Sequence, residues 1–222
     1  MKKRILILSL SVVAVAGGVL GASAYEAHII NVTAHIENAL RVFPSEKDFG
    51  TIFPQEYSQK SIFITTSSSF CQPTQRRVLN IDYKIVQKPK CKNDAGQYAP
   101  VDYATHQCPD GYVEMVSLCP YLSKTPAQTD NAPYTDYGVL PFHNPDDLSS
   151  VATGTINKDH DLQDEWIIDL PAPCFKGYCA QDWPSFVAKY NPNANPKDYE
   201  LVGDPNGTDL GCDLWVEVTK IY

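Results

Sequence analysis

The chain has 222 residues, a formal net charge of −8 at pH 7 and 43% hydrophobic residues. This acidic balance argues against binding to nucleic acid or to an anionic membrane surface, since both repel negative charge. The length suits one domain with a hydrophobic core of its own.

The first 24 residues have the pattern of a secretory signal peptide. A positive start at 2–4, an apolar run at 5–20 and small residues at 22–24 follow one another in the order typical of export signals. We therefore expect cleavage between Ala24 and Tyr25 and a secreted or cell-surface protein. Loss of three positive charges and no negative ones changes the formal net charge from −8 to −11. The alternative is a retained membrane anchor, because the run approaches the ~20 apolar residues that span a bilayer.

A β-strand is predicted directly after the cleavage site. Ile30, Val32, Ala34 and Ile36 alternate with polar residues, which gives an extended chain one apolar face. A strand at a newly formed chain end needs backbone partners. It finds them either in its own sheet or at the unpaired edge of another molecule. The sequence leaves both alternatives open.

Period-2 alternation predicts further strands along the chain. The two clearest cover 79–86 and 214–219, and shorter ones are expected at 50–53, 61–66, 112–118, 151–156 and 166–170. Many short strands separated by turn residues indicate an all-β fold. We predict a two-sheet antiparallel β-sandwich of the immunoglobulin-like or jelly-roll type, formed by residues 25–222 as a single domain.

One short helix interrupts this pattern. Trp183, Phe186, Val187 and Tyr190 have the spacing of a single apolar stripe on a helix. Asp182 stands at the expected N-cap position, where its side chain would accept a backbone hydrogen bond. We expect the helix to cover one edge or end of the sandwich.

Residues 88–138 differ from the rest in holding three cysteines, six prolines and few apolar runs. We interpret them as a disulfide-linked excursion from the sandwich. Its tyrosines are Tyr98, Tyr103, Tyr112, Tyr121, Tyr134 and Tyr137. If these tyrosines are exposed, their rings offer an aromatic surface that could bind a carbohydrate or another protein. The alternative is that the rings fill small hydrophobic cores under a long loop.

All seven cysteines lie in the mature chain, and an oxidising compartment favours disulfides. The candidates are Cys91, Cys108, Cys119, Cys174, Cys179 and Cys212. Cys174 and Cys179 form the most local pair. Because seven is an odd number, at least one cysteine is free or pairs between molecules. Zinc binding is the rival interpretation, but the C-x₂-C pairs typical of zinc sites are missing.

The sequence shows no catalytic motif. It has no H-E-x-x-H or G-x-S-x-G and no glycine-rich phosphate loop, so a non-enzymatic protein is predicted. Asp159, Asp161 and Asp164 lie in the densest acidic run and are candidates for calcium ligands. The EF-hand pattern fails there, because Leu162 occupies the glycine position. The alternative is a solvated turn between two strands.

The stretch KDFGTIFPQEYSQKSIFIT narrows the fold. A short strand at 49–53, a turn at 54–56 and a strand from Ser61 resemble the strand–PGE–strand element of many exported immunoglobulin-like sandwiches, with Gln55 at the usual glycine position. With the signal peptide that runs into a strand, this resembles the camelysin/TasA class of exported bacterial proteins. DFGTIFPQE, CFKGYCAQDW and CDLWVEVT are also similar to stretches of uncharacterised exported bacterial proteins. The chain departs from the camelysin/TasA class in its many cysteines and in Tyr25-Glu26-Ala27, where Phe-Ser-Asp or Phe-Asn-Asp is usual.

The resemblance implies a two-sheet sandwich with a structural role at the cell surface or in the extracellular matrix. In fibre-forming members of the class the freshly cut N-terminal strand inserts into the next subunit. By that resemblance 30–36 would be an assembly strand and the main partner a second copy of the chain. A monomeric binding or adhesion module is the alternative. A metalloprotease is the remote one, implied by camelysin alone.

Overall fold

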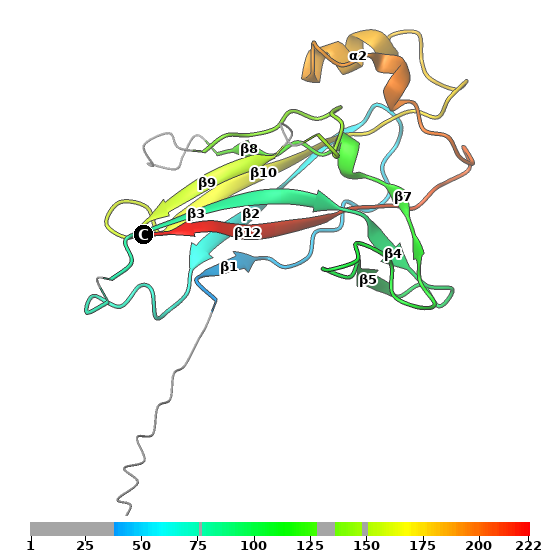
Figure 1. Cartoon of the computed structure of the whole chain (residues 1–222). Helices are drawn as coiled ribbons and strands as arrows, with labels where there is room; N and C mark the ends of the chain where they lie inside the picture. Colours follow the sequence, from blue (N-terminus) through cyan, green and yellow to red (C-terminus); the bar gives the residue numbers. More distant parts are fainter. Residues whose placement is uncertain (1–37, 76, 128–135, 148–150) are drawn as a thin grey trace, which may run out of the picture. The chain divides into compact units, whose positions relative to one another are not determined.

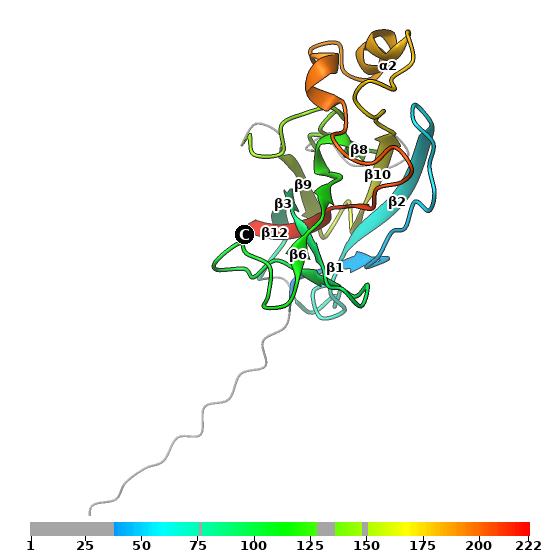
Figure 2. The ribbon, with the colours of Figure 1, turned by 90° about the vertical axis from the view of Figure 1, so that its right-hand side faces the viewer.

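The computed structural model describes residues 38–75, 77–127, 136–147 and 151–222, which belong to one compact unit. Their main feature is a pair of β-sheets packed face to face (Figures 1 and 2). The first sheet has the order β1-β2-β10-β8, with β1 at Leu40–Phe43, β2 at Tyr57–Thr66, β10 at Gln163–Pro171 and β8 at Thr125–Pro126. The second has the order β12-β3-β9, with β12 at Asp213–Ile221, β3 at Asn80–Lys88 and β9 at Ala152–Asn157. The predicted all-β class with a cysteine-rich region is confirmed.

Two small sheets extend this sandwich at one end. One has the order β5-β4-β6, formed by Tyr98–Pro100, Lys90–Lys92 and Val113–Glu114. The other pairs β7 (Val116–Ser117) with β11 (Leu210–Gly211) in parallel. From Cys119 onward the chain re-enters the sandwich through a 3-10 turn at Cys119–Tyr121 and then β8.

Alternating side chains of four strands fill the space between the two sheets. These inward residues are Ile62 and Ile64 of β2, Tyr83 and Ile85 of β3, Ala152 and Ile156 of β9, and Trp166, Ile168 and Leu170 of β10. All of them are buried, several completely. Each buried large aliphatic side chain contributes roughly 1.5–3 kcal/mol, so this alternation supplies the apolar driving force for sheet packing.

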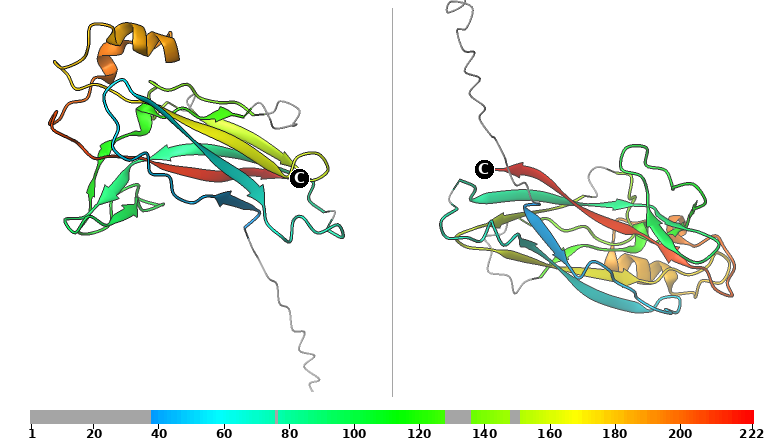
Figure 3. Two further views of the ribbon diagram at one scale, coloured as in Figure 1. Left: turned by 180° about the vertical axis from the view of Figure 1, so that it is seen from behind. Right: turned by 90° about the horizontal axis from the view of Figure 1, so that it is seen from below.

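One flank of the sandwich is closed by a short crossing segment. Val139 pairs with Lys124 next to β8, and two residues earlier Tyr137 pairs with Thr153 of β9. The same segment therefore connects the edges of both sheets on this side. Consequently β1 and β12, the opposite edges of the two sheets, lie together on the other flank, where no strand in the described ranges pairs them and the loop of residues 44–56 runs past β12 (Figures 1 and 3). We call this side the open flank.

The predicted helix is present as α2 (Trp183–Tyr190) and lies over one end of the sandwich, followed by a 3-10 turn at Pro196–Tyr199 (Figure 1). Trp183 and Val187 are buried, as the apolar stripe predicts. Asp182 is the N-cap residue, as predicted, and its C=O accepts a hydrogen bond from Phe186 N–H at 2.9 Å, but its side chain does not cap the helix. The Asp182 carboxylate makes no capping bond and instead accepts one from Gln55 Nε2 at 3.0 Å.

The predicted strand at 50–53 is wrong. Gly50 has a left-handed φ of 72° and its N–H binds Asp48 Oδ1 at 2.8 Å, so the chain bends there. Phe49 and Ile52 pack against the core without joining a sheet. The turn that follows is real, since Glu56 N–H donates to Phe53 O at 3.0 Å. Gln55 adopts a φ of 63° there, the conformation for which glycine is usual.

The predicted strand at 112–118 is divided in the structure. Val113–Glu114 (β6) pairs with β4, whereas Val116–Ser117 (β7) pairs with β11 of a different sheet. Met115 lies between them, with its N–H bonded to Lys90 O at 2.9 Å. The apolar run thus changes partners halfway, which alternation along one strand does not indicate.

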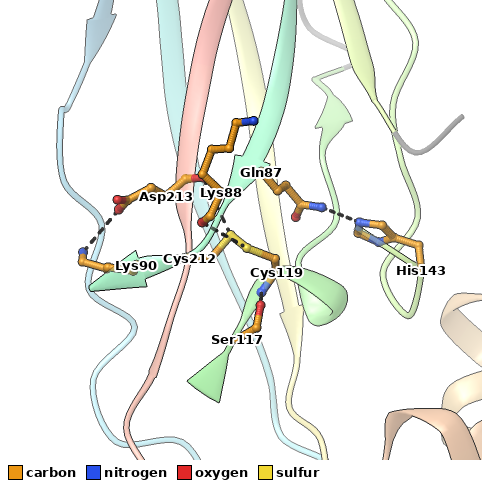
Figure 4. The surroundings of a disulfide bond; sticks show 8 residues. All are labelled: Gln87, Lys88, Lys90, Ser117, Cys119, His143, Cys212 and Asp213. Carbon is orange, nitrogen blue, oxygen red and sulfur yellow. Dashed lines mark hydrogen bonds and ion pairs between the residues drawn. A yellow bond between two sulfur atoms is a disulfide. The ribbon is translucent and has the colours of Figure 1, made fainter. Parts of the chain in front are cut away.

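All six candidate cysteines form disulfides. Cys174 is bonded to Cys179, as predicted from their spacing, and the other two pairs are Cys91–Cys108 and Cys119–Cys212. Cys71 is the free and exposed thiol, whose Sγ lies 2.9 Å from Thr66 Oγ1. Cys119–Cys212 joins the chain that leads into β8 to the chain that leads into β12, so it ties the two sheets at one end (Figure 4).

Gly154 of β9 is expected to be essential for the sheet packing. A Cβ at this position would lie 2.5 Å from Tyr83 Cζ and 2.9 Å from Asp136 Oδ1. We expect Gly154→Ala to lower the free energy of unfolding by about 1–3 kcal/mol, because the buried tyrosine cannot move without displacing its neighbours. Urea denaturation measures the effect.

Gly203→Ala is the matched control. Its new Cβ would meet only the Thr208 side chain, Oγ1 at 3.1 Å, and the Phe175 ring at 3.8 Å. Equal stability of the two variants would contradict the tight contact at Gly154.

Candidate functional site

The open flank exposes part of the backbone edge of β2. β10 pairs with β2 from Tyr57 to Thr65, whereas β1 pairs only with Phe63–Thr66. Among the described residues, Tyr57–Ile62 therefore has a strand on one side and none on the other. An unpaired edge of this kind is a template for another strand.

The direction of these edge groups follows from two hydrogen bonds. Ser67 N–H donates to Ala39 O at 2.9 Å on the β1 side, and Ala172 N–H donates to Glu56 O at 2.8 Å on the β10 side. Because bonding direction alternates along a strand, odd-numbered residues of β2 face β1 and even-numbered ones face β10. The N–H and C=O groups of Gln59 and Ser61 therefore point into the open flank.

Apolar groups lie close to this edge. Phe49 and Ile52, in the loop of residues 44–56, pack against the core and are only partly buried. On the outer face of the first sheet, a shallow hollow of about 430 Å³ is lined by Arg41, Phe43, Phe63, Thr65 and Gln163. Phe43 pairs directly with Phe63 and is 60% exposed. The flank thus combines bare backbone with exposed apolar surface.

The residues of the predicted assembly strand, Ile30, Val32, Ala34 and Ile36, lie outside the described residues. The same holds for the expected cleavage site at Ala24 and Tyr25. Their roles stay predictions. Within the described ranges, no helix is both long and apolar enough to cross a membrane.

The calcium candidates are separated in the structure. Asp159 is exposed in the turn between β9 and β10, whereas Asp164 is completely buried on the inner face of β10. Asp161 lies close enough to Asp164 that its charge raises the Asp164 pKa. In the described part of the chain, no group of three or more histidine, cysteine or acidic side chains is arranged to hold a metal ion.

A hydrogen-bonded chain crosses the core at Asp164. Trp166 Nε1–H donates to Tyr83 Oη at 2.7 Å, and the Tyr83 hydroxyl donates to Asp164 Oδ2. The two rings also meet edge to face, with centroids 6.4 Å apart. Burial and the charges of Asp136 and Asp161 raise the Asp164 pKa to about 9, although the Tyr83 bond opposes this. The carboxyl group is therefore protonated at neutral pH.

A second polar group lies in the same core. Lys124 is fully buried, its Nζ has no hydrogen-bond partner among the described residues, and burial lowers its pKa to about 7. His143 lies 2.6 Å, Nε2 to Nε2, from Gln87 of β3 (Figure 4). Burial and the Lys124 charge lower the His143 pKa to about 4. With the Gln87 amide nitrogen as donor, His143 Nε2 accepts this hydrogen bond.

Both buried groups are closed to solvent, with Tyr83 1% and Lys124 0% exposed. They specify packing rather than reach a substrate. Tyr83 was foreseeable, because it alternates with Ile81 and Ile85 on the inner face of β3. Lys124 and His143 were not foreseeable, since Lys124 precedes a strand of two residues and His143 belongs to no strand, so neither lies in a periodic pattern.

The tyrosines of the excursion have different environments. Tyr121 is buried in the main core, where its ring meets Phe142 and Tyr199 edge to face. Tyr98, Tyr103 and Tyr137 are 52%, 71% and 68% exposed, which leaves their rings available for contacts. Tyr134 lies outside the described residues.

Comparison with known proteins adds no assignment. No protein-family model matches the chain, and searches of curated proteins and of solved structures find no match either.

The buried lysine makes stability depend on pH. The ordinary lysine pKa is 10.5, so between about pH 7 and 10.5 the unfolded chain holds a proton that the folded chain lacks. Stability then rises with pH by about 1.4 kcal/mol per unit from this group. We expect Lys124→Met to be more stable than the wild type at pH 7 and to lack this rise, as measured by urea denaturation between about pH 7 and 9. Parallel pH profiles would contradict the burial of the amine.

Asp164 has the opposite effect. Its pKa is raised from 3.8 to about 9, so between these values the folded chain holds a proton that the unfolded chain has lost, and stability falls as pH rises. We expect the melting temperature of the wild type to fall relative to that of Asp164→Asn between about pH 5 and 8. The control is Asp159→Asn, which changes an exposed carboxylate of the same turn. If both variants follow the wild type, Asp164 is ionised in the folded state.

Proposed function

We propose that this protein is an exported structural subunit of the cell surface or extracellular matrix that self-associates by strand addition at the open flank. The observation that carries the proposal is the bare edge of β2, where Gln59 and Ser61 direct backbone groups to a flank with no strand in the described part of the chain. Three disulfides support an oxidising, extracellular environment.

The predicted N-terminal strand suits this edge. Its apolar face, Ile30, Val32, Ala34 and Ile36, has the alternation needed to continue the inner face of β2 next to Ile62. Main-chain hydrogen bonds to β2 would supply affinity, and apolar side chains entering between the sheets would supply specificity. The loop of residues 44–56 runs along this flank and would have to move aside (Figure 1).

Export would control the assembly. While the signal peptide is attached, the strand is tethered to an apolar segment, and cleavage after Ala24 would release it. Each subunit would then donate one strand and accept one. Such a head-to-tail contact generates an open polymer rather than a closed dimer.

Proline at Ser61 tests the acceptor edge. Because Ser61 directs its N–H to the open flank, Ser61→Pro removes a donor that binds no strand of the described fold. We expect the signal-cleaved variant to remain monomeric and folded, whereas Ser61→Ala, which keeps the backbone donor, assembles like the wild type. Negative-stain microscopy and size-exclusion chromatography distinguish the two.

Deletion of 25–37 tests the donor. The truncated chain is expected to be a folded monomer that cannot polymerise.

For the acceptor experiment, fibres of Ser61→Pro as abundant as those of the wild type would exclude β2 as the acceptor. For the donor experiment, the contradicting outcome concerns folding. A truncated chain that fails to fold would assign the strand to its own subunit.

A monomeric binding module is the second candidate. The exposed tyrosines beside lysines favour it, because they offer aromatic surface outside the open flank. A protein that stays monomeric after signal removal, yet retains a ligand, would fit this role.

A further inference from the structure

An aromatic pair lies on the outer face of the second sheet. Trp215 of β12 points away from the core, and the Tyr103 ring stacks on it with centroids 5.6 Å apart and planes 5° from parallel. Tyr103 is 71% exposed. One face of its ring therefore covers Trp215, and the other is open to a ligand.

The loop that carries Tyr103 is held in place. Asp102 Oδ1 accepts hydrogen bonds from Ala104 N at 3.0 Å and from Thr105 N at 2.8 Å, which also lowers the Asp102 pKa. The Cys91–Cys108 disulfide fixes the end of the loop to β4. The exposed ring is thus pre-organised, which reduces the entropy lost when a ligand binds.

A cation without an acidic partner lies beside the pair. Lys88 Nζ is 6.0 Å from the centroid of the Trp215 ring and 3.2 Å from His106 Nδ1, and it forms no ion pair with the carboxylates of the described residues. The Lys88 side chain points away from Asp213, which pairs instead with Lys90 at 3.7 Å (Figure 4). Although the net charge of −8 repels anions at long range, that repulsion is screened by salt, and a lysine without an acidic partner attracts a carboxylate in direct contact.

A second aromatic–lysine pair follows directly along the chain. Lys90 begins β4 two residues after Lys88, and its Nζ lies 4.9 Å from the centroid of the Tyr98 ring. Tyr98 is 52% exposed. Because Lys90 is paired with Asp213, this second contact adds an exposed aromatic ring for a further sugar unit of a polymer and no unpaired charge.

We propose that Tyr103, Trp215, Lys88 and His106 form a binding surface for an acidic polysaccharide whose sugar rings carry carboxylates. The open Tyr103 face stacks against a sugar ring, because the electron-rich face of an aromatic ring attracts positively polarised C–H edges. Lys88 and His106 receive the carboxylate through charge-assisted hydrogen bonds. Neither the surface nor its ligand depends on self-association at the open flank.

The test measures binding of the signal-cleaved protein, with its disulfides formed, to polygalacturonate by isothermal titration calorimetry. Tyr103→Ala and Lys88→Gln are each expected to weaken binding about tenfold, the loss of one stacking contact or one charged contact. The matched control is Tyr178→Ala, which removes a ring that is equally exposed, at 72%, and lies elsewhere on the molecule. It is expected to bind like the wild type.

Two further polymers separate the contributions. Polyglutamate carries carboxylates without sugar rings, and dextran carries sugar rings without charge, so both are expected to bind at least tenfold more weakly than polygalacturonate. The proposal is overturned if polygalacturonate does not bind, if Tyr103→Ala binds like the wild type, or if either control polymer binds equally well. Circular dichroism of each variant confirms that the fold is retained.

Discussion

The hydrogen-bonded chain from Trp166 through Tyr83 to Asp164 joins the two sheets at the centre of the core. Trp166 and Asp164 belong to β10, and Tyr83 belongs to β3 of the opposite sheet. Three polar groups in a dry interior are costly unless each finds a partner, so the network permits one arrangement of the sheets and penalises a slip in register. Gly154 leaves the room that the tyrosine ring needs.

The closure of one flank decides what the other flank can do. The crossing segment at Tyr137 and Val139 supplies backbone partners to the edges of both sheets on one side. On the other side β1 is too short to cover β2, and the described part of the chain provides no further strand. In the described part of the chain, β2 thus keeps an unpaired edge because the crossing segment lies on the opposite flank.

The three disulfides have two different structural roles. Cys119–Cys212 connects segments leading to the two sheets, whereas Cys91–Cys108 and Cys174–Cys179 hold local loops. The loop fixed by Cys91–Cys108 carries Tyr103 onto Trp215, a contact between residues far apart in sequence. Cross-linking therefore does more than compensate for a segment with few apolar residues: it presents an aromatic surface in a defined geometry.

The sequence by itself determined the all-β class, the helix at Trp183–Tyr190, and the positions of β3, β9, β10 and β12 to within a few residues. Their side chains alternate over enough positions for the buried face to be recognised, and that alternation is a local property. The sequence also identified the six cysteines that pair. The export signal and the assembly strand stay predictions.

Only the tertiary structure decided which strands are neighbours. Phe49 and Ile52 pack against the core although they belong to no strand. The apolar run at 112–118 is divided between two sheets. In both segments the burial of a side chain does not determine which backbone partner the residue has. Lys124 is inside because its neighbours in space, not in sequence, enclose it. The open edge of β2 and the stacking of Tyr103 on Trp215 likewise depend on contacts between segments far apart in the sequence. Local alternation of apolar and polar residues does not predict such contacts.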